Sequence, residues 1–271
     1  MREQGCKEAG RELIIEALKM VLPKLYTPIF HRMEDPVKFK KLSIDPKTDL
    51  GAYYALPIQV KRWKPVASKP AKYPEEMKVL AFCASPRRGG NTEVLIDEAI
   101  RGVRDAGAKV EKFVLQEMKL GFCDGCARCA DPDFEGFCSQ KDAVADIYPK
   151  IVDSDAIIIG FPIYTTRECG QLSVFFDRWR CLRRPGMETG SGKRAMVIGT
   201  WGYPYPDTYD YVVENIITLL QASGVITVEA LSACGFEGIL HGLDDKGEAI
   251  VLRFPKELEK AYLAGKSLAT G

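Results

Sequence analysis

Histidine is scarce in this sequence, which has only two, His31 and His241, among its 271 residues. A metal centre built on imidazoles, or a catalytic triad with a histidine base, is therefore not expected. Long apolar runs are missing as well, because the longest, around residues 157–164, is too short to span a bilayer. The first residues lack the apolar stretch of a secretory signal. These absences predict a cytoplasmic protein without a transmembrane segment.

Net charge is low too, since 38 lysines and arginines stand against 37 aspartates and glutamates. The chain has no overall positive charge that would attract nucleic acid, so we expect no nucleic-acid partner. Hydrophobic residues make up 46% of the sequence, a fraction typical of a globular protein. The length suits one large domain, or one domain with an extension.

Cysteine, by contrast, is abundant: four of the nine, Cys123, Cys126, Cys129 and Cys138, lie within sixteen residues. An odd number of cysteines in a reducing compartment favours metal or redox chemistry over a disulfide framework. Three closely spaced thiols and a fourth further on suit a cubane iron–sulfur cluster, in which each iron takes one thiolate. A closed zinc site is one alternative, although zinc loops more often present two separated pairs of cysteines. Free thiols or a redox disulfide are the other alternative.

The chain from Lys78 onward alternates between short β-branched runs and amphipathic helical stretches. This pattern is typical of a parallel sheet covered by helices on both faces. We expect strands at residues 78–83, 109–115, 155–160, 194–200 and 225–231. We expect helices at residues 92–106, 143–153, 170–181, 208–223 and 255–264. Five strands and five helices in near alternation predict a doubly wound α/β fold.

Residues 1–75 differ from the rest and are expected to form an N-terminal extension. An apolar helical stretch at residues 12–22 ends at Pro23, and seven more prolines follow with little periodicity. We therefore divide the chain into an extension, a helix plus a proline-rich arm, and a domain of residues 76–271. The domain carries the cysteine-rich loop, residues 119–140.

The segment after the first expected strand is rich in glycine and polar residues and leads directly into a helix. Anions bind at such places, because glycines let backbone N–H groups approach them and the helix supplies its positive end. The segment is neither a Walker A motif nor a Gly-x-Gly-x-x-Gly fingerprint, and a turn that only joins strand to helix is the alternative. The residues expected to bind an anion are Ser85, Arg87, Gly90, Asn91 and Thr92.

Two further loops follow the third and fourth expected strands, at residues 160–171 and 199–206. In a sheet of order 2-1-3-4-5, ligands bind outside the carboxyl ends of the strands at the switch point, so all three loops should meet. Aromatic residues there would flank a flat ring, unless they are isolated aromatics at loop ends. The residues expected to contact such a ring are Pro162, Ile163, Tyr164, Thr165, Thr200, Trp201, Gly202 and Tyr203.

Three segments carry a resemblance to a known family: Ser85-Pro-Arg-Arg-Gly-Gly-Asn-Thr92, Pro162-Ile-Tyr164 and Gly170-Gln-Leu-Ser-Val-Phe-Phe-Asp-Arg178. They look like the corresponding segments of the NADPH-dependent FMN reductase family, which has a flavodoxin-like fold. The cysteine loop, inserted after the second strand, further resembles that of the iron–sulfur flavoproteins of anaerobic archaea and bacteria. In those proteins a compact cysteine motif binds a [4Fe–4S] cluster near FMN.

The resemblance implies a three-layer αβα sandwich with a five-stranded parallel sheet and assigns roles to individual residues. Ser85, Arg87, Asn91 and Thr92 would bind the phosphate of FMN, and residues 162–165 would contact its isoalloxazine ring. The implied cluster ligands are Cys123, Cys126, Cys129 and Cys138. Among the other thiols, we expect Cys83 and Cys169 beside the flavin, and Cys6, Cys181 and Cys234 to be packing residues.

The implied function is electron transfer. The cluster would exchange single electrons with ferredoxin or another electron carrier, while FMN would accumulate two and pass them to an acceptor. No catalytic acid or nucleophile is expected. One alternative is an NAD(P)H-dependent FMN or quinone reductase with a structural zinc or free thiols; another is a non-enzymatic electron carrier or regulator. A homodimer or homotetramer is implied, since the cluster loop of one subunit can complete a site over the flavin of another.

Overall fold

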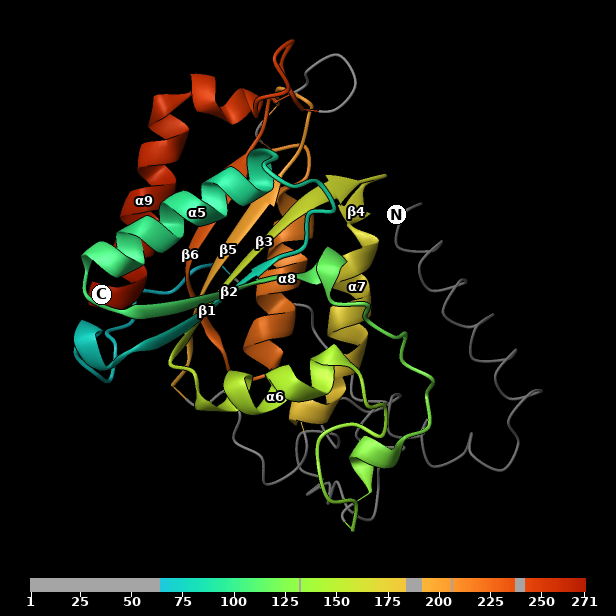
Figure 1. Ribbon diagram of the computed structural model, residues 1–271. Coiled ribbons are helices and arrows are strands. Elements are labelled where there is room, and N and C mark those ends of the chain that lie inside the picture. The colour runs from blue at the N-terminus through green and yellow to red at the C-terminus, as the bar shows by residue number, and fades with distance from the viewer. Residues whose placement is uncertain (1–63, 132, 184–191, 206, 237–241) are drawn as a thin grey trace, which may run out of the picture. The chain divides into compact units, whose positions relative to one another are not determined.

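Five parallel strands form one sheet in the computed structural model, which describes residues 64–131, 133–183, 192–205, 207–236 and 242–271. The strands are β1 (Lys78–Cys83), β2 (Lys109–Val114), β3 (Ala156–Tyr164), β5 (Arg194–Thr200) and β6 (Ile226–Ala233). Their order is β2-β1-β3-β5-β6, and the short β4 (Arg167–Glu168) pairs antiparallel with β3 (Figure 1). Among the parallel strands alone this is the order 2-1-3-4-5, so the predicted flavodoxin-like fold is confirmed.

The burial and polarity of the side chains in each strand agree with its central or edge position in the sheet. β3 and β5 lie inside the sheet, and nearly all their side chains are buried. β3 contains four isoleucines, and the middle of β5 is the apolar run Met196-Val-Ile198, as in strands that helices cover on both faces. β2 is an edge strand and carries the exposed side chains of Lys109 and Glu111. Such charges discourage pairing with another sheet edge.

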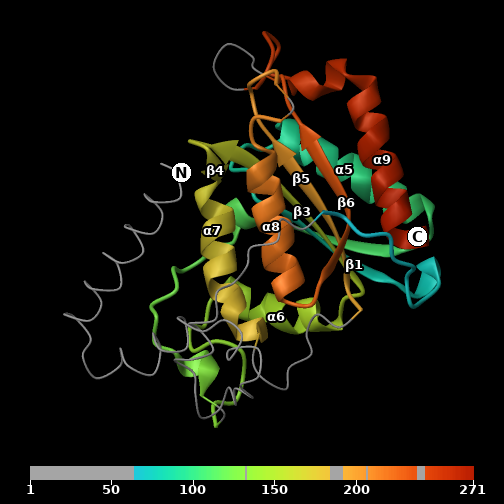
Figure 2. The same cartoon turned by 180° about the vertical axis from the view of Figure 1, so that it is seen from behind.

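Helices cover both faces of the sheet, as the two views in Figures 1 and 2 show. They are α5 (Asn91–Asp105), α6 (Ala143–Asp153), α7 (Gly170–Asp177), α8 (Asp210–Ala222) and α9 (Pro255–Thr270). α5 and α9 share an apolar core with Ile158, whereas α6, α7 and α8 share the opposite core with Ile157 and Ile159. Neighbouring residues of β3 therefore supply the two cores in alternation, as the pleat of a strand requires.

Two glycines bring α5 and α9 into backbone contact. A Cβ atom at Gly102 would lie 2.0 Å from the carbonyl oxygen of Tyr262, and one at Gly265 would lie 2.0 Å from that of Ala99. No larger residue fits at either position without moving a helix. This contact fixes the C-terminal helix against the helix that begins at the loop after β1.

The predicted element boundaries are largely confirmed. β1, β5 and α6 have the bounds expected from the sequence. The helix predicted for residues 170–181 is wrong in its last four residues, because α7 ends at Asp177 and the chain continues as a 3-10 helix at Arg178–Arg183. The third strand is longer than predicted, because it continues through the apolar residues up to Tyr164.

The end of the predicted extension lies against the sheet. The Val66 N–H donates to the Thr227 carbonyl of β6 over 2.9 Å, and Arg194 of β5 donates to the Ser68 carbonyl. Lys72 forms an ion pair of 2.6 Å with Asp155. The apolar helix predicted for residues 12–22 lies outside the described residues, so the division at residue 75 stays a prediction. No helix in the described ranges is long and apolar enough to cross a membrane.

Candidate functional site

The loop after β1, residues 84–90, forms a tight turn that leads into α5. Its start is tied to β3, because the Ala84 N–H donates to the Gly160 carbonyl over 2.9 Å. The buried hydroxyl of Ser85 accepts a hydrogen bond of 3.1 Å from the Arg87 N–H. Gly89 has a φ angle of +64°, in the left-handed region that favours glycine. The loop thus ends in the free N–H groups of the first turn of a helix, a ready site for an anion.

The two arginines of this loop point to different partners. Arg88 forms ion pairs with Glu93, at 2.6 Å, and with Glu117, at 3.2 Å. The guanidinium carbon of Arg87 instead lies 5.8 Å from the centre of the Tyr164 ring. Arg87 therefore faces the loop after β3, whereas the charge of Arg88 is directed to neighbouring carboxylates.

A buried carboxylate, Glu93, braces the loop from behind. It accepts the Gly89 N–H over 2.7 Å and the ammonium group of Lys112 over 2.8 Å. Burial alone would raise the pKa of Glu93, but the hydrogen bonds from Lys112 and Gly89 outweigh it and hold this pKa below its usual range. The sequence interpretation overlooked Glu93, whose position in the first turn of the helix was the available signal.

The predicted anion ligands Asn91 and Thr92 have structural partners. The Asn91 amide donates to the Gly242 carbonyl over 3.0 Å, and its oxygen accepts the Val251 N–H over 2.9 Å. The Thr92 and Thr200 hydroxyls lie 2.7 Å apart and join the first turn of α5 to the end of β5. Both side chains therefore hold neighbouring segments in place around the loop.

The predicted Pro-Ile-Tyr loop is in fact the end of β3. Thr165 and Thr166 then form the two-residue turn to β4, with φ angles of +50° and +65°. Such a turn usually carries asparagine and glycine, and β-branched residues in the left-handed region are strained. The Tyr211 hydroxyl donates to the Thr166 carbonyl over 2.6 Å and supports the turn. Strain of this kind is typical of functional sites.

The loop after β5 separates a buried tryptophan from exposed tyrosines. Trp201 is only 5% exposed, and its indole N–H donates to the Tyr205 carbonyl over 3.2 Å. Tyr203 and Tyr205 are 54% and 70% exposed. Trp201 therefore anchors the loop in the core, and the tyrosines are the aromatic groups that the loop presents to a ligand.

Contacts among these segments bring the three predicted loops together at the carboxyl ends of β1, β3 and β5, a region that we call the carboxyl-edge site. Arg87 meets Tyr164, and Thr92 meets Thr200. The buried Cys169 joins the region as well, since its thiol donates to the Ala84 carbonyl over 3.2 Å. Burial raises the pKa of Cys169 to about 11, so this thiol is protonated at neutral pH.

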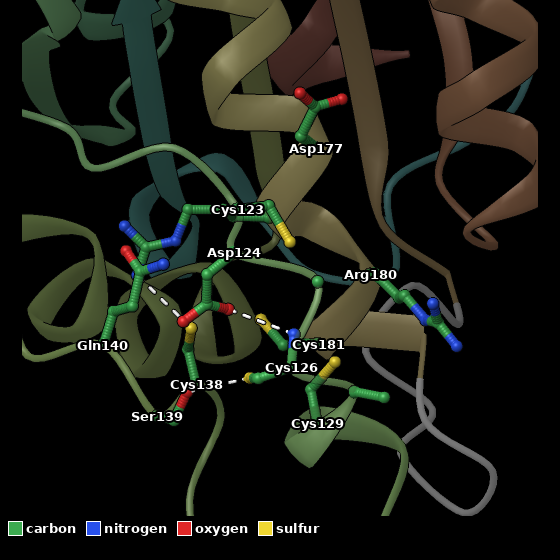
Figure 3. Close-up of a pocket in the computed structure, with 13 residues that line it drawn as sticks. Cys123, Asp124, Cys126, Cys129, Cys138, Ser139, Gln140, Asp177, Arg180 and Cys181 are labelled. Carbon is green, nitrogen blue, oxygen red and sulfur yellow. Dashed lines mark hydrogen bonds between the residues drawn. The ribbon is translucent and has the colours of Figure 1, made fainter.

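A second site lies in the cysteine loop. The four predicted ligands Cys123, Cys126, Cys129 and Cys138 line a single cavity, which we call the cysteine cavity (Figure 3). Its volume is about 40 Å³, more than the roughly 10–15 Å³ that one water molecule needs. Cys123 and Cys126 are exposed, whereas Cys129 and Cys138 are half-buried. One side of the cavity is therefore open to solvent.

A fifth thiol reaches the same cavity. Cys181 comes from the 3-10 helix after α7 and lies in the wall of the cysteine cavity (Figure 3). Its classification as a mere packing residue is therefore incomplete. Burial raises the pKa of Cys181 to about 12, so its thiol stays protonated. Cys83, expected beside the flavin, is buried in the core next to α5, and burial raises its pKa to about 12.

Side-chain hydrogen bonds hold the irregular cysteine loop in shape. The Asp142 carboxylate accepts the N–H of Gly121 over 2.9 Å and caps the start of α6. Gln140 donates to the Phe122 carbonyl over 2.7 Å, which ties the two ends of the loop together. Ala127 adopts a φ angle of +57°, in the left-handed region. The shape of the loop therefore depends on hydrogen bonds from individual side chains, because the loop is not part of a sheet.

The sequence interpretation did not single out Arg178, which the structure places in the wall of the cysteine cavity. Its side chain is fully buried, forms an ion pair with Asp142 and donates to the Cys138 sulfur over 3.3 Å. Burial alone would raise the pKa of Asp142, but the hydrogen bonds from Arg178 and Gly121 hold it below its usual range. The available signal was the Asp-Arg pair that ends the third resembling segment.

The two sites lie at opposite ends of α7. The helix begins next to Cys169 at the carboxyl-edge site and ends next to Arg178 in the wall of the cysteine cavity. Its eight residues span about 12 Å at 1.5 Å per residue. A groove of about 290 Å³ lies between the start of α7 and residues 115–122.

The donors of the cysteine cavity fit an anionic, sulfur-rich group. The four motif thiols line the cavity. The buried Nε–H of Arg178 donates no hydrogen bond to any described residue. An unpaired buried donor needs an acceptor, and the sulfides of an iron–sulfur cluster are acceptors. No three His, Cys, Asp or Glu side chains in the described ranges are grouped closely enough to hold a single metal ion.

Comparison with known proteins identifies the family of the chain. The sequence model described as NADPH-dependent FMN reductase matches residues 77–230. An iron–sulfur flavoprotein of Archaeoglobus fulgidus is 28% identical over 194 residues, 71% of this chain and 79% of that protein. An iron–sulfur flavoprotein of Methanocaldococcus jannaschii is 37% identical over 107 residues, 40% of this chain and 54% of that protein.

Two further relatives extend the comparison. A Bacillus subtilis protein named as an NAD(P)H-dependent FMN-containing oxidoreductase is 30% identical over 132 residues, 46% of this chain and 67% of that protein. The structure of the NAD(P)H:quinone oxidoreductase from Methanothermobacter marburgensis superimposes with a TM-score of 0.54 and 17% identity. It covers 72% of this chain and 97% of that one, and at this identity it supports the fold alone.

Proposed function

The chain belongs to the NADPH-dependent FMN reductase family of flavin-dependent oxidoreductases, and we propose that within it this protein is an iron–sulfur flavoprotein. FMN would bind at the carboxyl-edge site, and a [4Fe–4S] cluster would bind in the cysteine cavity. The observation that carries the proposal is that all four cysteines of the sequence motif line one cavity. Relatives named iron–sulfur flavoproteins support it.

The carboxyl-edge site offers the groups that FMN requires. Its phosphate would meet the free N–H groups at the start of α5, the Ser85 hydroxyl and the charge of Arg87. Arg87 and Tyr164 lie side by side, so the phosphate and ring positions would be adjacent. The backbone at the Thr165 turn would face the polar edge of the ring, and Gly202 would allow close approach from the loop after β5.

The cysteine cavity offers four thiolates and an open side for an electron-transfer partner. When bound, the cluster exchanges single electrons and FMN holds two, so together they couple one-electron and two-electron chemistry. Phe122, beside the exposed Cys123, is itself 76% exposed. An exposed aromatic next to the ligands suits a docking surface for ferredoxin or another small carrier.

The separation of the two sites favours an oligomer. Because α7 stands between them, a homodimer or homotetramer would bring the cysteine loop of one chain next to the carboxyl-edge site of another. Light scattering of the anaerobically purified protein tests this proposal. A monomer at all concentrations would contradict it.

Cofactor analysis tests the proposed function directly. After anaerobic purification we expect about four irons, four sulfides and one FMN per chain, the content that one cubane cluster and one flavin require. A protein with full flavin content but without iron or sulfide would contradict the proposal. Zinc in place of iron would contradict it as well.

A second candidate is an NAD(P)H-dependent FMN or quinone reductase in which the cysteine loop holds zinc or free thiols. The name of the family and that of the Bacillus subtilis relative favour NAD(P)H as donor. Stopped-flow mixing separates the two candidates. Bleaching of the flavin by NADPH that is faster than bleaching by reduced ferredoxin favours the second, and the reverse order favours the first.

A further inference from the structure

Arg178 places a positive charge in the wall of the cysteine cavity, away from water. It is the first residue after α7, and its side chain is 0% exposed. Its carbonyl oxygen accepts the buried Tyr148 hydroxyl over 3.3 Å, which helps to fix the position of the backbone. In such a low-dielectric position a charge acts on its neighbours more strongly than it would at the surface.

The guanidinium is only partly satisfied by protein groups. Its Nη1 atom forms the ion pair with Asp142 and lies 3.4 Å from the Gly121 carbonyl. Its Nη2 atom donates to the Cys138 sulfur, and its buried Nε–H has no partner among the described residues. One donor therefore already contacts a thiol of the cavity, and a second is available there.

We propose that Arg178 tunes the reduction potential of the cluster by donating hydrogen bonds to Cys138 and to the cluster from a buried position. The inference rests on the proposed function. Hydrogen bonds to the sulfurs are among the factors that set the potentials of iron–sulfur clusters. One-electron reduction adds one negative charge to the cluster, and a fixed buried cation stabilises that form. Arg178 therefore raises the potential.

The same contact assigns Cys138 as the fourth ligand. Its distance in sequence from Cys129 leaves the choice open between Cys138 and Cys181, which also lines the cavity. Among the thiols of the described residues, Cys138 is the one that accepts a hydrogen bond from the buried guanidinium, over 3.3 Å. Arg178 is thus a positioning residue that acts through Cys138.

A redox titration of the holoprotein followed by electron paramagnetic resonance tests the proposal. In Arg178→Gln we expect the equilibrium constant for one-electron reduction of the cluster to fall about tenfold or more. For one electron, a tenfold change corresponds to a reduction potential that is about 59 mV more negative. Arg180→Gln is the matched control, because Arg180 lines the same cavity but is exposed. Its shift should be several-fold smaller, since solvent screens its charge. Equal shifts in the two variants would overturn the proposal.

Arg178→Lys keeps the test decisive if the glutamine variant loses its cluster. Lysine retains the charge but lacks the planar fork that reaches Asp142 and Cys138 together. We expect the cluster of Arg178→Lys to have a reduction potential between those of the wild type and Arg178→Gln. If Arg178→Gln binds no cluster, the potential of Arg178→Lys should still lie below that of the wild type. An unchanged potential in the variants overturns this inference alone. A wild type without iron and sulfide overturns the proposed function and this inference with it.

Discussion

The carboxyl-edge site and the cysteine cavity are built in different ways. The first is formed where buried strands end: the loop after β1 is tied to β3 by a backbone hydrogen bond, and Thr92 meets Thr200 across the sheet. The second lies on an irregular loop whose shape depends on side chains, chiefly Asp142 and Arg178. One site is thus a consequence of the fold, and the other of a few polar contacts.

This difference predicts how each site responds to change. At the carboxyl-edge site the backbone would supply much of the binding surface. The replacement of a single side chain should therefore weaken FMN binding without abolishing it. In the cysteine cavity the proposed ligands are side chains on a loop with exposed cysteines, so the loss of one should prevent the cluster from binding.

Replacement of one central cysteine should separate the two sites most clearly. In Cys126→Ser we expect loss of nearly all iron and sulfide, because a cubane cluster needs a ligand at each iron. FMN content should stay at the wild-type value, since α7 separates the sites. Metal and flavin analysis of the anaerobically purified variant measures both. Simultaneous loss of flavin would show that the sites are not independent.

Removal of Asp142 should destabilise the cysteine loop. Asp142→Ala leaves the buried charge of Arg178 without its counter-ion and removes the cap of α6. Breaking a buried ion pair in this way costs about 3–5 kcal/mol of unfolding free energy. Urea denaturation checks the value. Lys260→Ala is a suitable control, because its ion pair with Glu257 lies at the surface, where such pairs contribute about 0–1 kcal/mol.

Arg87 and Arg88 form a matched pair at the carboxyl-edge site. A charge-assisted hydrogen bond contributes about 1.5–3 kcal/mol, so Arg87→Gln should weaken FMN binding about 10- to 100-fold. Arg88→Gln should have a smaller effect, because Arg88 already pairs with Glu93 and Glu117. Fluorescence titration of the flavin-free protein gives both dissociation constants. The opposite ranking would contradict the assignment of Arg87 to the phosphate.

Acid should weaken both sites through their braced carboxylates. The pKa values of Asp142 and Glu93 lie below their usual range in the folded protein. Their stabilisation is therefore present above the unfolded values, about 3.9 to 4.3, and is lost as pH falls through the folded values. Urea midpoints of the wild type should drop below about pH 4. Asp142→Asn should lack part of this drop, and an identical drop would contradict the prediction.

Thiol labelling should distinguish the two regions under mild conditions. Burial raises the pKa of Cys83 and Cys181 to about 12 and that of Cys169 to about 11. These thiols should resist iodoacetamide at neutral pH, because the thiolate is the reactive form. Cys123 and Cys126 are exposed and should be labelled first in cluster-free protein. Mass spectrometry of peptides gives the order.

The sequence predicted the regular parts of this molecule well. Apolar, β-branched runs identified β1, β5 and α6 with their observed bounds, because strands and helices follow local periodicity. It also placed all four motif cysteines around one cavity, since a short loop with glycines can curl them together. Spacing alone carried that prediction.

Contacts between distant residues were beyond the sequence. The ion pair between Arg178 and Asp142 joins residues 36 positions apart and depends on how α7 ends. The partners of Asn91, at residues 242 and 251, depend on how the C-terminal segment packs on α5. The burial of Trp201 was not predicted, and it depends on contacts with the Ala233 carbonyl of β6 and with the ring of Tyr209. Such contacts depend on tertiary packing, which the local sequence pattern does not reveal.

We propose that one chain carries two redox groups at two separate sites. An anaerobic coulometric titration of the holoprotein measures how many electrons each chain takes up. The account predicts about three electrons per chain, one for the cluster and two for FMN. An uptake of about two electrons, with only the flavin spectrum changing, would contradict it.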